Sequence, residues 1–355
     1  MTAGEGARVT ASPPRLFGVD AARGVALLGM FAAHTVGLGS EQVFDGRSAI
    51  LFATVAGLSL GLLTGGATPP PPGSRGNART VVLVRGSVLV LLGLALTLFL
   101  QPPIAVILDS YGFAFLLLIG VLSVGRPVLA LLAAVFAIAG PLLVTAVTEG
   151  RTLDDVVGPL QVFAEWLFFG PYPVVVWLAF LLIGLVLGRS DLRDRLTAAL
   201  TLVVGALAAV LGYGSALVIP GVDISAHSGT TAEVVGSGGV AVAIIGALSL
   251  LDSATGAGER VARGIRFVLS PVAAAGSMAL TLYTAHAVVL AIIQATAERP
   301  ERWQAPVWTF PALAIGALVI AALWRRFVGT GPLELGLRAL TRLAIRGATR
   351  PRVAP

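Results

Sequence analysis

Three histidines are the residues of this chain best suited to moving protons, because an imidazole gains and loses a proton near neutral pH. His34 stands near the end of an apolar run that opens with Asp20 and Arg23, and His286 lies in the middle of a later apolar run. An ionisable side chain inside a bilayer costs roughly 2.5–3.5 kcal/mol on insertion scales, so each is a functional hypothesis by default. We predict that His34 acts as a general base, with His286 or Asp109 orienting its ring or relaying its proton.

The polar residues in or near apolar runs also have purely structural interpretations. A histidine could simply hydrogen-bond to a neighbouring helix, and an aspartate at the end of a span could only cap a helix. Opposite charges three residues apart on a helix could neutralise each other. These alternatives apply to His34 and His286, to Asp109, to His227 as a plain loop residue, and to the pair Asp20 and Arg23.

The composition is that of a membrane protein. The chain has 355 residues, of which 56% are hydrophobic and 12% charged, and its mean hydropathy is +0.92. A soluble domain carries about twice that charged fraction. The absence of cysteine excludes disulfides and thiolate nucleophiles. The pI near 10.8 does not indicate a nucleic-acid partner, because the arginines are spread through the loops between apolar runs.

Repeated apolar runs of about 20 residues predict an all-α, polytopic membrane helix bundle. The ten predicted spans are 16–38, 47–66, 79–100, 104–124, 127–147, 171–189, 195–219, 231–252, 270–296 and 306–326. Segment 159–169 is predicted to be a short interfacial or re-entrant helix, so that an eleventh span remains open. Segment 67–78 contains four consecutive prolines and is predicted not to be helical.

The arginines fall on alternate loops and on the C-terminal tail, whereas the intervening loops carry mostly acids. The positive-inside rule therefore predicts that both termini are cytoplasmic, in a multi-pass protein of the inner or plasma membrane. We expect residues 1–15 to form a cytoplasmic tail, 16–326 the membrane domain, and 327–355 a cytoplasmic amphipathic helix and tail. Glu334 and Arg338, on one stripe of that helix, and Asp20 are assigned structural roles.

With this orientation the polar residues form two layers. The cytoplasmic layer is mainly basic and suits a phosphorylated donor, because guanidinium groups hold phosphates well. It comprises Asp20, Arg23, Arg79, Arg85 and Arg189. The outer layer of imidazoles, carboxylates and phenols suits proton transfer and hydroxyl recognition. It comprises His34, Asp45, Arg47, Asp109, Tyr111, Tyr172, Trp177, His227, Glu233, Tyr283 and His286.

Three motif matches are rejected on context. Gly57-Leu-Ser-Leu-Gly61 matches a nucleophile elbow, but that motif needs a strand before it, and these glycines favour close helix packing instead, as do Gly184 and Gly188. The glycines at 236–239 lack the strand that precedes a dinucleotide fingerprint. The histidines lie on three separate segments, so no metal site is expected.

Several motifs together resemble a known family. They are Arg15-x4-Asp20-x2-Arg23-Gly24 with the apolar run to His34, Phe44-Asp-Gly-Arg47-Ser48, Ile107-Leu-Asp109-Ser-Tyr111-Gly112, Tyr172-Pro173-x3-Trp177 running to Gly184-x3-Gly188-Arg189, His227-Ser-Gly229-Thr, Tyr283-x2-His286 and Gly331-Pro-Leu-Glu334-x3-Arg338. This set resembles bacterial transmembrane acyltransferases of the heparan-α-glucosaminide N-acetyltransferase-like and YeiB-like type, with the acyltransferase-3 enzymes as more distant relatives.

The resemblance implies acyl transfer from a coenzyme A thioester to a hydroxyl or amine of a sugar-like or envelope acceptor, with the first-helix histidine at or near the active centre. We then expect acetyl- or acyl-CoA as co-substrate, held by Arg23, Arg79, Arg85 and Arg189, with catalysis by His34, Asp109 and His286. Substrate contacts are assigned to Asp45, Arg47, Tyr111, Tyr172, Trp177, His227 and Tyr283. Of these, Tyr111, Tyr283 or Arg47 would stabilise an oxyanion.

Other functions remain open at this point. The outer polar layer could instead bind the substrate of a transporter or lipid exporter, although no internal repeat is evident. A non-catalytic envelope scaffold is a third alternative. Direct transfer and an acyl-histidine intermediate are both compatible with the sequence, which fixes neither the acceptor nor the acyl length. Glycine-rich helix faces permit a homodimer, and membrane lipid is the expected surrounding.

Overall fold

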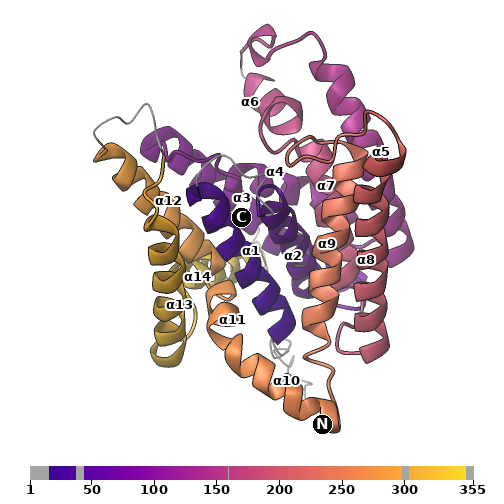
Figure 1. The fold of residues 1–355 in the computed structure, drawn as a ribbon, viewed down its shortest axis with the longest axis vertical. Coiled ribbons are helices and arrows are strands. Elements are labelled where there is room, and N and C mark those ends of the chain that lie inside the picture. The colour runs from indigo at the N-terminus through magenta and orange to yellow at the C-terminus, as the bar shows by residue number, and fades with distance from the viewer. Residues whose placement is uncertain (1–15, 37–43, 159, 298–303, 349–355) are drawn as a thin grey trace, which may run out of the picture.

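The computed structural model describes residues 16–36, 44–158, 160–297 and 304–348, and within these ranges all regular elements are helices (Figure 1). The α-helices are α1 (Phe17–Thr35), α2 (Arg47–Leu63), α3 (Arg75–Ala95), α4 (Leu108–Leu118), α5 (Arg126–Thr148), α6 (Leu160–Ala164), α7 (Val174–Gly188), α8 (Arg195–Val218), α9 (Thr231–Ser249), α10 (Ala257–Val268), α11 (Ser270–Gly276), α12 (Ala279–Ala295), α13 (Thr309–Phe327) and α14 (Pro332–Ala348). Short 3-10 turns are η1 (Pro72–Ser74), η3 (Ile119–Val121) and η4 (Leu153–Asp155), and π-helical turns are η2 (Leu96–Leu100) and η5 (Glu165–Phe169).

Each of the ten predicted spans contains a helix or a pair of helices, so the prediction of an all-α polytopic membrane protein is confirmed. By length and composition, five described helical stretches could each cross a membrane: Pro72–Leu100, α5, α8, α9 and α13. The number rises to seven if α6 with α7, and α11 with α12, each form one bent span. The total of ten spans and the cytoplasmic termini stay predictions, and Arg15 of the first motif lies outside the described residues.

The expectation for segment 67–78 was wrong in part, and the span 270–296 has a bend that the sequence did not indicate. The predicted span 270–296 is divided between α11 and α12, whose axes differ by 82°. Gly276 lies against the backbone of α1 at this point, and that contact holds α11 at its own angle. Residues 72–78 of the proline-rich segment are helical, in η1 and the first turn of α3. Proline is tolerated in a first helical turn, where its missing N–H has no intrahelical partner anyway.

Close packing through glycines joins the central helices, as the sequence predicted for Gly57, Gly61, Gly184 and Gly188. In the α2–α7 pair, a Cβ on Gly57 would clash with the Leu181 carbonyl, and one on Gly184 would clash with that of Thr54. Any side chain at these positions would push the two helices apart. The close contact places the first turn of α7, which carries Trp177, beside the start of α2.

Helix α1 occupies the middle of the bundle and is in contact with α2, α9, α11, α12 and α13 (Figure 1). The N–H groups of Phe17 and Gly18, at the first turn of α1, donate to the carboxylate of Asp252 at 3.2 and 2.8 Å. Asp252 lies just beyond α9, so a distant carboxylate caps this helix. The tie fixes the axial position of α1, which carries Arg23 in its first half and His34 in its last turn.

The amphipathic helix predicted in the tail is present as α14, and it packs against α3 and α12 with Leu337 buried. The Glu334 carboxylate accepts hydrogen bonds from the N–H groups of Leu280 and Thr281, at 2.9 and 3.2 Å, and from the Thr281 hydroxyl at 2.6 Å. These amides belong to the first turn of α12 and have no intrahelical acceptor. Glu334 therefore holds the start of the helix that carries His286.

Candidate active site

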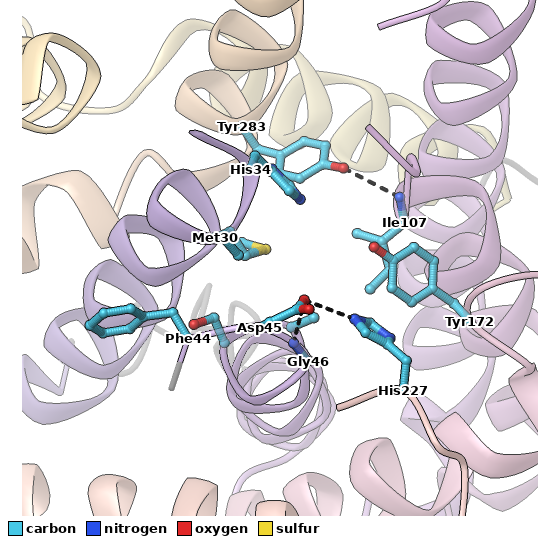
Figure 2. A pocket seen from close by; sticks show the side chains of 12 residues that line it. Met30, His34, Phe44, Asp45, Gly46, Ile107, Tyr172, His227 and Tyr283 are labelled. Carbon is cyan, nitrogen blue, oxygen red and sulfur yellow. Dashed lines mark hydrogen bonds and ion pairs between the residues drawn. The ribbon is translucent and has the colours of Figure 1, made fainter. Parts of the chain in front are cut away.

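A small pocket lies where the last turn of α1 meets the start of α2 (Figure 2). Its volume is about 20 Å³. Five of its lining residues are among those predicted from the sequence, namely His34, Asp45, Tyr172, His227 and Tyr283. The remainder of the lining is Met30, Ala33, Phe44, Gly46, Ser48, Ala49 and Ile107. Residues far apart in sequence thus gather around one imidazole.

His34, at the pocket wall, forms a pair with His286, which lies behind it. The Nδ1 atom of His34 lies 3.0 Å from Nε2 of His286, and the two rings are nearly parallel, with an interplanar angle of 4°. His286 is 1% exposed, packed between Phe31 and Tyr283. Of the two roles predicted for His286, the geometry matches that of orienting His34.

The hydrogen-bond partners assign the protons of this pair. The Nδ1 of His286 lies 2.7 Å from the backbone carbonyl oxygen of Tyr283, which can only accept. The proton of a neutral His286 is therefore on Nδ1, and its Nε2 carries a lone pair. His34 must donate from Nδ1 to that lone pair, so the Nε2 of a neutral His34 is unprotonated. An imidazole with a free Nε2 lone pair at a pocket wall is equipped to act as a base.

Asp45 and His227 form the opposite wall (Figure 2). The Asp45 Oδ1 lies 3.1 Å from the His227 Nε2 and accepts from the Gly46 N–H at 2.9 Å. This hydrogen bond raises the pKa of His227 above 6.5 and lowers that of Asp45 below 3.8. Buried Glu233 holds the His227 loop by accepting from the N–H groups of His227 and Gly229 at 2.8 and 2.7 Å.

The predicted aromatic residues divide between the pocket and its support. The Tyr283 hydroxyl accepts from the Ile107 N–H at 3.3 Å and lies at the pocket wall (Figure 2). Buried Tyr111 donates to the Ala49 carbonyl at 2.8 Å, one layer behind. Trp177 is also buried and meets the Tyr172 ring edge-on, with centroids 5.2 Å apart. The geometry therefore gives Tyr111 and Trp177 a supporting position.

Two further predicted residues point elsewhere. Arg47 donates from Nε to the Tyr213 hydroxyl at 2.9 Å and lies over that ring. The Asp109 Oδ2 accepts from the Trp166 indole N–H at 2.9 Å, and Asp109 lines a second, larger cleft rather than the histidine pocket. His286, not Asp109, is the partner that the structure gives to His34.

The residues of the basic cytoplasmic layer also differ in their surroundings. Arg23 donates to Asp20, to the Gly276 carbonyl and to the Ser59 hydroxyl at 3.0, 3.1 and 2.6 Å, so the predicted neutralising pair with Asp20 exists. Arg85 has its Nε buried and without a hydrogen-bond partner. Arg338 and Arg23 are the positive groups that act most strongly on the Arg85 charge.

The other two predicted donor-binding arginines differ from Arg85. Arg79 is exposed on the first part of α3. Arg189 is 2% exposed, and its NH1 and NH2 groups donate to the carbonyls of Gly61, Gly66 and Leu122 and to the Thr64 hydroxyl, at 2.8 to 3.0 Å. Through NH1 and NH2, Arg189 ties residues 61–66 to Leu122, so these two nitrogens already have protein acceptors, whereas its Nε, like that of Arg85, is buried without one.

Sequence reasoning missed several residues near the site. Trp166 and Glu165 line the second cleft, and the Tyr213 hydroxyl lies 2.7 Å from Ser237 while it accepts from Arg47. For Trp166 and Glu165 the available signal was an aromatic and an acidic residue inside the short segment 159–169, which is predicted to be interfacial or re-entrant and is assigned no chemistry. Among the described residues, no group of three or more histidine, cysteine, aspartate or glutamate residues is placed to hold a metal.

The structure is a multi-pass helical bundle that brings two histidines together beside a small pocket. The chain belongs to the Acyl_transf_3 family, whose description is acyltransferase domain and whose model matches residues 88–326. The matched region includes His227 and His286, and it begins after His34 and Asp45. No curated protein and no solved structure matches the chain. The family match and the apolar helices together identify the protein as a membrane acyltransferase.

Proposed function

We propose that the protein transfers an acetyl or other acyl group from acyl-CoA to a hydroxyl or amine of a sugar-like or envelope acceptor, with His34 as general base, in the inner or plasma membrane. The observation that carries this proposal is the chain of contacts from the Tyr283 carbonyl through His286 to His34. It leaves the His34 Nε2 lone pair for the acceptor proton. The family supplies the reaction class.

In this proposal the CoA phosphates bind at the basic group formed by Arg23, Arg85 and Arg338. The buried Arg85 Nε has no hydrogen-bond partner and can donate to a phosphate oxygen, and the carboxylates of Asp20 and Glu334 only partly offset the positive charge of the group. Arg23 and His34 are eleven residues apart on α1, which corresponds to about 16 Å along a helix axis. That length suits an extended pantetheine arm running beside α1.

The transfer step is direct. The acceptor oxygen or nitrogen attacks the thioester carbonyl carbon while its proton passes to the His34 Nε2. The resulting oxyanion is stabilised by the Tyr283 hydroxyl at the pocket wall. When the tetrahedral species collapses, the carbonyl re-forms and the C–S bond breaks. The proton passes from His34 to the departing thiolate. His227 and Asp45 close the pocket from the opposite side.

The test is turnover of acetyl-CoA by purified protein, measured as release of free CoA thiol, for wild type and His34→Gln. Loss of general-base catalysis costs 10²- to 10⁴-fold in rate, so we expect a drop of about that size. Arg195→Gln, which changes an exposed residue at the start of α8, is the control for handling and folding. Turnover that stays at the wild-type rate in His34→Gln contradicts the proposal.

A further inference from the structure

A second cleft lies beside the histidine pocket and is much larger. Its volume is about 350 Å³, within the range of small-molecule sites, which run from about 300 to 1,000 Å³. It is bounded by the turn after η2, the start of α4 and the segment from Glu165 to Tyr172. Among the described residues, Tyr172 alone lines both cavities, and its hydroxyl donates to the Ala105 carbonyl of the large cleft at 3.3 Å.

The two volumes imply a division of labour. A cavity needs roughly 10–15 Å³ to hold one water molecule, so the histidine pocket of about 20 Å³ accommodates only the reacting atoms. The body of any acceptor larger than a few atoms must lie outside it. The large cleft is adjacent, because Tyr172, which lines the small pocket (Figure 2), also lines the large cleft.

The chemistry of the large cleft favours a ligand that donates hydrogen bonds. Asp109 and Glu165 both line it, and the Asp109 Oδ1 is buried without a hydrogen-bond partner. Leaving a buried charged oxygen unpaired is costly, and a ligand O–H or N–H would remove that cost. Trp166 holds the other Asp109 oxygen and presents an aromatic ring at the same wall.

The cleft also discriminates by charge. Its lining comprises Thr97, Gln101, Pro102, Ile104, Ala105, Val106, Asp109, Ser110, Glu165, Trp166, Gly170, Pro171 and Tyr172. Among these residues there are two carboxylates and no basic side chain, so a phosphate or carboxylate on a ligand would meet like charge without a counterion. The walls are built on π-helical turns at η2 and η5, irregularities that occur frequently at functional sites.

We infer that this cleft is the acceptor site, and that it takes a hydroxyl- or amine-bearing acceptor that is neutral or cationic and excludes anionic ones. The inference rests on the proposed function for its reaction, but the binding it describes is separable from catalysis. Asp109 and Glu165 are then specificity-determining residues, and Tyr172 borders the passage by which the acceptor's reactive group reaches His34.

Three sugars that share one ring and differ in charge test the inference directly. Purified protein is incubated with tritiated glucosamine, and unlabelled glucose, glucosamine and glucose 6-phosphate compete for it. We expect glucosamine and glucose to compete and glucose 6-phosphate to compete at least ten-fold more weakly. Asp109→Asn and Glu165→Gln should each weaken glucosamine binding about ten-fold, the order expected for one lost charge-assisted interaction. In each variant the difference in binding strength between glucosamine and glucose 6-phosphate should also become smaller.

Matched controls change exposed carboxylates outside the cleft: Asp154→Asn for Asp109, and Glu149→Gln for Glu165. Both should bind as wild type does. Ala105→Trp leaves every charge in place and fills the cleft, so it should abolish binding even if Asp109→Asn fails to fold. Equal competition by all three sugars, or normal binding by Ala105→Trp, overturns the inference.

His34→Gln separates this inference from the proposed function. It should lose acetyl-CoA turnover and keep glucosamine binding. Retained turnover in that variant would contradict the general base and leave the cleft supported by its own binding data. Glucosamine binding that is insensitive to Asp109, Glu165 and Ala105 would instead refute the cleft, whatever His34 does.

Discussion

The His286 Nε2 lies 3.0 Å from the His34 Nδ1 and acts as its hydrogen-bond acceptor, because the other His286 nitrogen donates to the Tyr283 carbonyl. One imidazole therefore fixes the tautomer of the other. His286, on α12, does not itself line the pocket, yet it decides which nitrogen of the pocket residue His34 carries the lone pair. His286 is a positioning residue in this arrangement.

The first prediction separates positioning from bulk packing at residue 286. His286→Gln places an amide oxygen near the former Nε2 and can still accept from His34, whereas His286→Leu cannot. We expect kcat/KM for acetyl-CoA to fall about ten-fold in the glutamine variant and 10²-fold or more in the leucine variant. The pH profile of kcat/KM should keep its shape in the former and shift in the latter. Equal losses in both variants would assign His286 a packing role only.

The second prediction concerns pH and the ion pair between His227 and Asp45. The raised pKa of His227 means that its contribution is complete below pH 6.5 and is lost as pH rises through the raised value. The lowered pKa of Asp45 means that its contribution is complete above pH 3.8 and is lost as pH falls through the lowered value. The free energy of unfolding of the wild type should thus exceed that of Asp45→Asn by the largest amount between pH 3.8 and pH 6.5.

The size of this effect is modest, because the side chains of His227 and Asp45 are 35% and 51% exposed and solvent screens them. We expect at most about 1 kcal/mol between wild type and Asp45→Asn. NMR titration of the three histidines checks the assignment, since the pKa of His227 should fall in Asp45→Asn. An unchanged His227 titration would mean that the hydrogen bond does not control it.

The third prediction addresses the donor side. Arg85→Gln removes one charge from the basic group and should raise the KM for acetyl-CoA about ten-fold with a smaller change in kcat, because a charge-assisted hydrogen bond contributes about 1.5–3 kcal/mol. Arg195→Gln, at an exposed helix start, is the matched control. The KM of the wild type should rise with added salt more steeply than that of Arg85→Gln. A KM that is indifferent to Arg85 would place the CoA phosphates elsewhere.

The fourth prediction is about stability. Asp252→Ala removes the acceptor for the first two N–H groups of α1 and should lower the free energy of unfolding by about 1–2 kcal/mol, the range for lost helix caps. Asp194→Ala is the comparison, because Asp194 caps α8 locally and is exposed, so its loss should cost less. Unfolding in mixed detergent, followed by circular dichroism, measures both. Identical losses would mean that the long-range cap at Asp252 contributes nothing beyond a local one.

The sequence was sufficient for the helices and for much of the pocket. Apolar runs of membrane length mark helices reliably, and ionisable residues within them are too costly to be accidental. That argument selected His34, and the outer polar layer and its motifs added Asp45, Tyr172, His227 and Tyr283; the structure gathers all five around one pocket. Glycine spacing likewise indicated the close contact of α2 with α7.

What could not be predicted depends on contacts between distant backbones. Arg189 has the sequence context of a basic helix end, and its burial depends on carbonyls that residues 61–66 and Leu122, both distant in sequence, bring to it. The break between α11 and α12 arises where Gly276 meets α1, and no local signal places it. Asp109 was assigned to the histidines because it shares their layer, but Trp166, on a segment read as interfacial, draws it to the other cleft.

The hold of Glu334 on the first turn of α12 has a consequence for biosynthesis. Glu334 lies 48 residues after His286 in the chain, so the helix carrying this imidazole lacks its anchor until the ribosome has also delivered residue 334. The position of His286 is consequently not fixed by this contact before the start of α14 has been made. A chain that stops before α14 would therefore leave the first turn of α12 without its carboxylate anchor.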